Sequence, residues 1–143
     1  MQLLAYILIY PILWIVSMLP FRILYFVSDL LYILMYYVIG YRKNAVKENL
    51  NLVFPNKSEA ELRTVLKKFY HHLCDMLVES IKSMNISIDS MKSRYKFNNL
   101  DIITGYEKQN KSIILMCAHY GSWEWIFILQ TYTTHRSYAI YKR

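Results

Sequence analysis

The first forty residues contain only two charged side chains, Arg22 and Asp29. Two apolar stretches fill this region, residues 1–20 and 21–41, and Pro20 ends the first of them. About 19 helical residues reach roughly 28 Å, which is close to the thickness of a bilayer's hydrocarbon core. No Lys or Arg precedes the first stretch and no Ala-x-Ala-like site follows it, which disfavours a cleaved signal peptide. We therefore expect residues 1–41 to form membrane-anchoring or interfacial helices.

The second apolar stretch is edged with tyrosines and is followed at once by Arg42, Lys43 and Lys47. Tyrosine is favoured at membrane interfaces, and basic residues are favoured on the cytoplasmic side. The sequence leaves open whether these helices span the bilayer, dip into it or lie on its surface. We predict that the chain associates with the bacterial inner membrane and that its catalytic part faces the cytoplasm.

The formal charge of +7 comes entirely from residues 41–143. An apolar N-terminal segment followed by a basic segment suggests that the partner is an anionic membrane surface or a molecule that bears phosphate. The alternative is that the basic residues only keep exposed helices soluble. Nucleic acid is not an expected partner because no recognised binding motif or concentrated basic stripe is present. The two cysteines form neither a disulfide framework nor a zinc pattern, and no metal site is expected.

A capping box at Ser58 and Glu61 predicts the start of the longest helix, which we expect to end near Met84. Shorter helices are expected over 41–54, 87–96 and 99–110. The long helix has one apolar stripe at helical spacing. That stripe comprises Leu62, Val65, Leu66, Phe69, Leu73, Leu77 and Ile81. His71, Asp75 and Glu79 share the other side, where a solvated or polar-packed face is favoured over a metal site because one helix cannot surround an ion.

A short apolar run from Ile113 to Cys117 predicts a strand buried on both faces. Gly121 and Ser122 then supply a turn and a helix N-cap. Residues 134–141 predict a second strand after an apolar helix. We therefore expect an α/β fold in which the N-terminal helices lead into a βαβ unit of a mostly parallel sheet. Two strands do not form a stable sheet alone, so this sheet is expected to be incomplete.

His119 follows the first predicted strand, and Glu124 falls in the first turn of the predicted helix. A histidine fixed at a strand end, with a carboxylate five residues on to orient it, is a candidate general base. The alternative is a histidine that only caps or packs. Cys117 lies close by and offers a nucleophilic thiol as a further alternative, although a buried cysteine usually behaves as a small hydrophobe.

The segment His119-Tyr-Gly-Ser-Trp-Glu124 resembles the His-x4-acid motif of the lysophospholipid acyltransferase superfamily. In particular it resembles the late acyltransferases of lipid A biosynthesis, which usually read His-x-Gly-Asn-Trp-Glu, so Ser122 replaces the Asn. The resemblance extends upstream through residues 48–55. Lys142 matches the basic position of the family's second motif, and Arg143 stands where Pro is usual. Family members are about twice as long, so residues 42–143 are expected to be the N-terminal part of a truncated acyltransferase domain, inactive alone.

The resemblance implies an O-acyltransferase that moves a fatty acyl chain from an acyl thioester to a hydroxyl of a lipid A precursor. The implied donor is acyl carrier protein or coenzyme A as co-substrate, with no bound cofactor, and the acceptor is an anionic glycolipid. His119 would be the general base, and Glu124 would hold the imidazole tautomer. Ser122, Trp123 and Lys142 would contact the substrates. The alternative is a non-catalytic membrane-associated fragment or scaffold.

Overall fold

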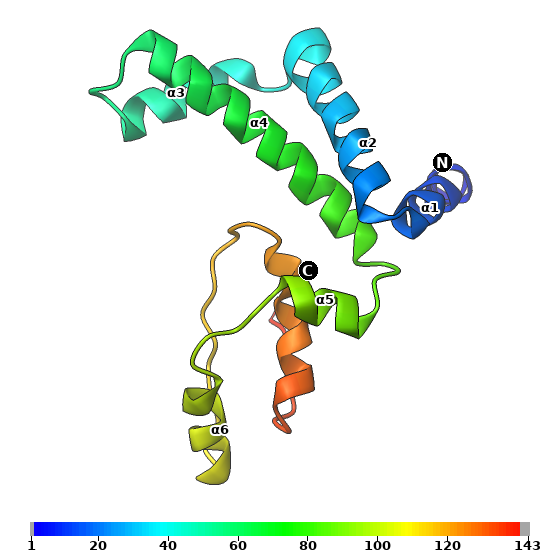
Figure 1. Cartoon of the computed structure of the whole chain (residues 1–143), viewed down its shortest axis with the longest axis vertical. Helices are drawn as coiled ribbons and strands as arrows, with labels where there is room; N and C mark the ends of the chain where they lie inside the picture. The colour runs from blue at the N-terminus through cyan, green and yellow to red at the C-terminus, as the bar shows by residue number, and fades with distance from the viewer. Residues whose placement is uncertain (1, 141–143) are drawn as a thin grey trace. The chain divides into compact units, whose positions relative to one another are not determined.

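The computed structural model describes residues 2–140 (Figure 1). The chain divides into two compact units, Met1–Asn85 and Ile86–Arg143. The first unit contains α1 (Gln2–Met18), α2 (Phe21–Ile33), the π-helix η1 (Leu34–Ile39), α3 (Lys43–Val53) and α4 (Glu59–Lys82). The second contains α5 (Ile88–Arg94), α6 (Leu100–Lys108) and the 3₁₀-helix η2 (Trp123–Tyr132). The predicted division into residues 1–41 and 42–143 concerns membrane association and stays a prediction.

The capping box predicted at the start of α4 is confirmed. The Ser58 hydroxyl accepts a hydrogen bond from the Glu61 amide at 3.4 Å, and the Ser58 amide donates to the Glu61 carboxylate at 2.8 Å. Two backbone donors at the helix end are thus satisfied reciprocally. The hydrogen bonds from Ser58 also lower the pKa of Glu61 below its ordinary value. The N-terminal cap of α4 is therefore formed by residues that are close together in the sequence.

The buried row of α4 differs in part from the predicted apolar stripe. Leu62 and Leu66 are buried as expected, but Phe69 and Leu77 are exposed. The row continues at every fourth residue through Tyr70, Cys74, Val78 and Lys82. This i, i+4 row is the one that neighbouring helices cover, and it includes side chains with polar groups. Apolar character alone therefore did not identify the buried face.

The predicted polar face of α4 packs against α2. The Tyr25 hydroxyl donates to the Glu79 carboxylate at 2.7 Å, and the Ser28 hydroxyl donates to the Asp75 carboxylate at 2.6 Å. Ser28 is fully buried. Because burial of an unpaired hydroxyl or carboxylate is costly, these contacts fix how α2 and α4 are aligned. We call this α2–α4 interface the polar seam.

His71 extends the polar seam toward the second half of α2. Its Nε2 lies 2.8 Å from an Asp29 carboxylate oxygen, and its Nδ1 lies 3.2 Å from an Asp75 oxygen. The imidazole ring also packs on Tyr32, with ring centroids 5.4 Å apart. One side chain of α4 thus contacts two turns of α2. Asp29 is a charged residue in an otherwise apolar stretch of the sequence, and His71 is its partner.

The end of α4 lies beside the corner between α1 and α2 (Figure 1), and Lys82 joins the three helices there. Its side chain is buried, and its amine donates to the backbone carbonyl of Ser17 at 2.7 Å and to that of Leu19 at 2.8 Å. The amine also lies 5.6 Å from the centre of the Phe21 ring. A lysine amine near the carbonyl end of a helix satisfies acceptors that the helix leaves unpaired. Lys82 therefore holds α1, α2 and α4 together.

The other end of α2 is fixed by aromatic packing. Tyr36 and Tyr70 pack edge to face with ring centroids 5.4 Å apart, and Leu66 completes this buried cluster. The Tyr70 hydroxyl donates to the Tyr41 carbonyl. Gly40 ends the π-helix in the left-handed conformation, with φ 64°. The chain thereby turns from η1 into α3 beside the middle of α4.

The predicted βαβ unit is wrong. Residues 111–122 and 133–140 form no strand, and the helix between them is a 3₁₀-helix. Ile114 and Met116, expected in a buried strand, are 90% and 91% exposed. A strand needs a neighbouring strand to pair its backbone amides and carbonyls, and neither predicted strand finds one among the described residues. The apolar run indicated a tendency to be buried, but it did not specify what would cover it.

The second unit is held by aromatic contacts around η2. Trp125 and Ile128 are its most buried apolar side chains, each 4% exposed. The ring of Tyr132, at the end of η2, lies 5.8 Å from that of Phe97 and 4.7 Å from the Lys92 amine. Both α5 and the loop that follows it thus pack on η2.

Candidate functional site

His119 lies on an exposed, irregular segment immediately before a tight turn. Its ring packs against the Trp123 ring, with centroids 4.3 Å apart and planes tilted by 55°. Gly121 stands between them in the left-handed conformation, with φ 57°. The predicted turn at Gly121 is therefore confirmed. A side chain at this position would be strained by the backbone conformation, although the space around it is open.

Glu124 lies in the first turn of η2 and is half-buried. No hydrogen bond or ion pair joins its carboxylate to His119 in the part of the chain that the structure describes. The two groups lie on either side of the Gly121 turn in the sequence. Their catalytic roles stay predictions.

The other predicted site residues have different surroundings. Ser122 is the N-cap of η2 but makes no side-chain capping hydrogen bond, so the predicted hydroxyl cap is not formed. Trp123 is half-buried through its contact with His119. Cys117 is exposed and not buried in a strand, which corrects the expectation for this thiol. Lys142 lies outside the described residues.

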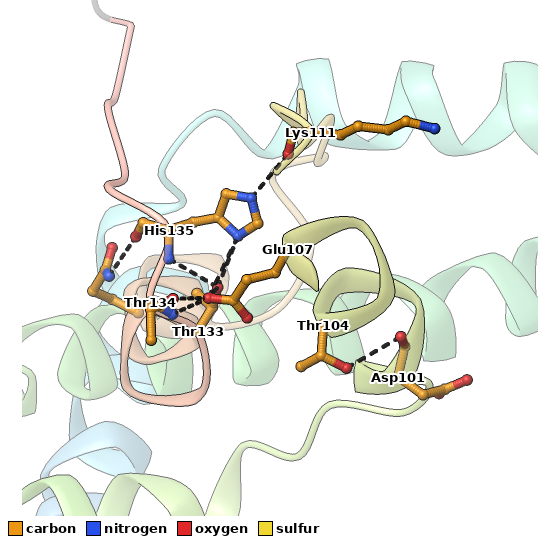
Figure 2. Close-up of polar contacts among 8 residues, drawn as sticks. Asp101, Thr104, Glu107, Lys111, Thr133, Thr134 and His135 are labelled. Carbon is orange, nitrogen blue, oxygen red and sulfur yellow. Dashed lines mark hydrogen bonds and ion pairs between the residues drawn. The ribbon is translucent and has the colours of Figure 1, made fainter. Parts of the chain in front are cut away.

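A polar cluster that the sequence analysis missed joins the end of α6 to the residues after η2 (Figure 2). One Glu107 carboxylate oxygen accepts hydrogen bonds from the Thr134 amide at 2.5 Å, from the Thr134 hydroxyl and from the Thr133 hydroxyl at 3.3 Å. The bonds from Thr134 are the main cause that lowers the pKa of the Glu107 carboxyl. A carboxylate that accepts several hydrogen bonds is stabilised in its charged form.

His135 completes this cluster, which we call the Glu107 clamp. Its Nδ1 lies 3.1 Å from the Thr133 hydroxyl and 3.8 Å from the Glu107 carboxylate. Its Nε2 lies 3.0 Å from the Lys111 carbonyl, as Figure 2 shows. The clamp joins both ends of the segment 111–135, which contains His119 and Glu124. Its sequence signal is the row of hydrogen-bonding side chains Thr133, Thr134 and His135 after an apolar helix.

The Glu107 clamp is expected to weaken in acid. The pKa of Glu107 in the folded chain is lowered from 4.5, so its stabilising contribution is present above that value and is lost as pH falls through the folded pKa. The amide chemical shift of Thr134 should therefore change as the pH falls below the ordinary pKa range of a glutamate. Two-dimensional NMR of the wild type and of Glu107→Gln at a series of pH values measures this change.

Asp101→Asn is the matched control for this titration. Asp101 lies on the same helix, and only its backbone carbonyl has a contact in the cluster view, with Thr104 (Figure 2). This variant should keep the pH response of Thr134, whereas Glu107→Gln should abolish it. A Thr134 response that persists in Glu107→Gln would show that another group controls the amide.

The sequence model for bacterial lipid A biosynthesis acyltransferases matches residues 2–143. No curated protein and no solved structure gave a match. The matched range includes the two apolar helices, α4 and the His119–Glu124 segment. The chain therefore belongs to the bacterial lipid A biosynthesis acyltransferase family.

Proposed function

We propose that this protein transfers a fatty acyl chain from an acyl thioester to a hydroxyl of a lipid A precursor, at the cytoplasmic face of the inner membrane. The observation that carries the proposal is the segment from His119 to Glu124. It presents an exposed imidazole against Trp123 beside a left-handed turn, with a carboxylate in the following helical turn. The family to which the chain belongs supports acyl transfer in lipid A synthesis, and it is membrane-associated in bacteria.

In the proposed reaction, His119 acts as the general base. One imidazole nitrogen accepts the proton of the acceptor hydroxyl while that oxygen attacks the thioester carbonyl carbon. The resulting tetrahedral intermediate collapses, the carbon–sulfur bond breaks, and the departing thiolate takes the proton from the imidazolium. The products are an ester and a free thiol, so no oxidant, metal or bound cofactor is needed for balance. The exposure of His119 leaves its ring accessible to a hydroxyl.

Glu124 is proposed to orient His119 and to stabilise the imidazolium that forms. The described structure lacks this contact, and catalytic hydrogen bonds are often long or poorly aligned before substrate binds. Glu124 lies in the first turn of η2, at an edge of the Gly121 turn, so substrate binding would bring it to the imidazole by a local rearrangement. Trp123 now occupies one face of the imidazole and would set the approach of that carboxylate.

The proposed substrates fit the chemistry of the chain. Ser122, Trp123 and Lys142 are proposed to contact them through a hydroxyl, an apolar ring and a cationic amine. The formal charge of +7 favours an anionic glycolipid acceptor and an acidic or phosphate-bearing donor, which acyl carrier protein and coenzyme A both provide. Trp123 offers apolar surface for an acyl chain.

The proposal is tested by an acyl transfer assay on membranes that contain the protein. A lipid A precursor with a free hydroxyl is incubated with acyl carrier protein thioester or with coenzyme A thioester, and products are identified by mass spectrometry. We expect the acceptor to gain the mass of one acyl group with one of these donors. An acceptor of unchanged mass with both donors, in membranes where the protein is folded, would contradict the proposal.

A second candidate function is a non-catalytic membrane-associated scaffold. The observation that favours it is the lack of a hydrogen bond between His119 and Glu124 in the described residues. A scaffold requires neither side chain, so the His119→Ala variant of a scaffold would retain full function in cells. If the protein is an acyltransferase, the same variant would lose that function.

A further inference from the structure

The helix formed by α2 and η1 presents an uncovered apolar face. Over Phe21–Ile39 it is long and apolar enough to cross a membrane, by length and composition. Five large side chains recur at helical spacing on this face, with exposed fractions from 48% to 62%. They are Ile23, Phe26, Leu30, Ile33 and Tyr37. Proteins in water rarely expose a continuous apolar stripe of this length, so a partner is expected to cover it.

The opposite side of the same helix is attached to α4 at both ends. Near the start of α2, Tyr25 bonds to Glu79, and in the first half of η1 the Tyr36 ring packs on Tyr70. Between them the polar seam continues through Ser28 and Asp75. These contacts align α2 and η1 with the part of α4 from Tyr70 to Glu79. The position of α2 in a membrane therefore also fixes the depth of this part of α4.

The part of α4 from Lys68 to Lys82 is too polar for the hydrocarbon core. It contains Lys68, His71, His72, Asp75, Glu79 and Lys82 within about four turns. Lys68 and His72 are exposed. If α2 crossed the bilayer, α4 would be carried to the same depth, where an exposed lysine is strongly disfavoured. A position of α2 parallel to the membrane plane avoids this, because α4 then stays in water.

We infer that α2 and η1 form an interfacial docking surface for one leaflet of an anionic phospholipid bilayer, and that they do not span it. The apolar stripe enters the leaflet while the polar seam and α4 face the cytoplasm. Amphipathic helices that lie in the interface combine such a stripe with a polar face. This inference rests on the geometry of the first unit and is independent of the acyl transfer chemistry.

Basic residues at the end of η1 make an anionic surface the best partner. Arg42, Lys43 and Lys47 follow the helix directly, and Arg42 and Lys47 are exposed. The Lys43 amine lies 3.9 Å from the centre of the Tyr36 ring and donates to the Tyr36 carbonyl at 3.4 Å. Tyrosine and basic side chains together are suited to the headgroup region.

The first test asks which side of the membrane each end of α2 faces. In a Cys117→Ser background, single cysteines are introduced as Arg22→Cys before the stripe, Asn44→Cys after it and Lys68→Cys on α4. All three positions are exposed, and the remaining Cys74 is buried. Right-side-out and inside-out membrane vesicles are treated with a membrane-impermeant maleimide. We expect all three cysteines to react from the cytoplasmic side only. Reaction of Arg22→Cys and Asn44→Cys from opposite sides would overturn the inference.

The second test measures lipid contact. A fluorophore is attached to Phe26→Cys on the stripe and, as the matched control, to His72→Cys on the outer face of α4. Vesicles of phosphatidylethanolamine and phosphatidylglycerol contain a shallow nitroxide-labelled lipid as the quencher. We expect strong quenching at position 26 and little at 72. Replacing phosphatidylglycerol by neutral phosphatidylcholine should weaken vesicle binding roughly tenfold or more, because several basic residues lose their partner.

The alternative occupant of the stripe is a second copy of the chain. Analytical ultracentrifugation in lipid-free detergent-free buffer, combined with the fluorescence of the position 26 label, distinguishes the two. A dimer that shields this label, together with no quenching by lipid, would overturn the inference. Neither readout measures acyl transfer, so failure here leaves the proposed function untouched, and an inactive protein can still pass both tests.

Discussion

His119→Ala is expected to lower the rate of acyl transfer by roughly 10²–10⁴-fold, the usual contribution of a positioned general base. The substitution removes the only group near the Gly121 turn that is proposed to accept the acceptor's proton. It also removes a ring contact with Trp123, but His119 is exposed and is not one of the buried residues of the second unit. The loss should therefore fall on kcat, with KM for the acyl donor changed little. Initial rates over a range of donor concentrations separate the two constants.

His72→Ala is the matched control for this substitution. His72 is also exposed, lies on α4, and has no proposed role in acyl transfer. It should retain activity close to that of the wild type. Glu124→Gln should lower kcat by less than His119→Ala, since an amide can still orient the ring but cannot stabilise the imidazolium. Full activity of His119→Ala would remove the proposed base from the mechanism and support the scaffold alternative.

Lys82→Met is expected to lower the free energy of unfolding by about 3–6 kcal/mol, because the Lys82 amine donates two hydrogen bonds and each bond from a charged donor contributes roughly 1.5–3 kcal/mol. Methionine keeps much of the apolar part of the lysine side chain. It removes the amine that donates hydrogen bonds to the Ser17 and Leu19 carbonyls. Ser17 is fully buried, so water replaces that donor poorly. The corner between α1 and α2 should also loosen. Urea unfolding followed by far-ultraviolet circular dichroism measures the change in free energy.

Lys68→Met provides the same chemical change at an exposed position on the same helix. Substitutions at such surface positions usually stay within about 0.5 kcal/mol. Equal unfolding free energies for the two variants would mean that the Lys82 contacts contribute nothing to stability. A further check is hydrogen exchange at the C-terminal turns of α1 and α4, which should accelerate in Lys82→Met only.

Features that depend on neighbouring residues were predictable from the sequence. Ser58 and Glu61 define the start of α4 because both partners of the capping box lie within one helical turn. The turn at Gly121 was predictable because glycine adopts the left-handed conformation without strain. The motif between His119 and Glu124 was recognisable for the same reason, since its residue types and spacing are contained in six positions.

Features that depend on distant partners were not predictable. The apolar stripe predicted for α4 ended at Ile81, whereas the last buried residue of this helix is Lys82. The Lys82 amine donates to the carbonyl of Ser17, a residue that precedes α2 in the sequence. The run Ile113–Cys117 was apolar enough for a strand, but strand formation depends on a pairing partner that the pattern does not contain. The Glu107 clamp also joins residues separated by more than twenty positions. In each case the local sequence pattern contained no information about the distant residues that contact it in the fold.

The long sequence separation across the polar seam has a consequence for biosynthesis. Ribosomes add roughly 5–20 residues per second, so the stretch between Ile39 and Lys82 takes on the order of seconds to appear. During this interval Tyr25, Ser28 and Asp29 have emerged, but the residues of α4 that bond to them have not. The nascent helices therefore need lipid or a chaperone before their own protein partner exists. Targeting of the ribosome to the membrane would thus precede completion of the first unit, and the order of translation itself would favour docking before folding.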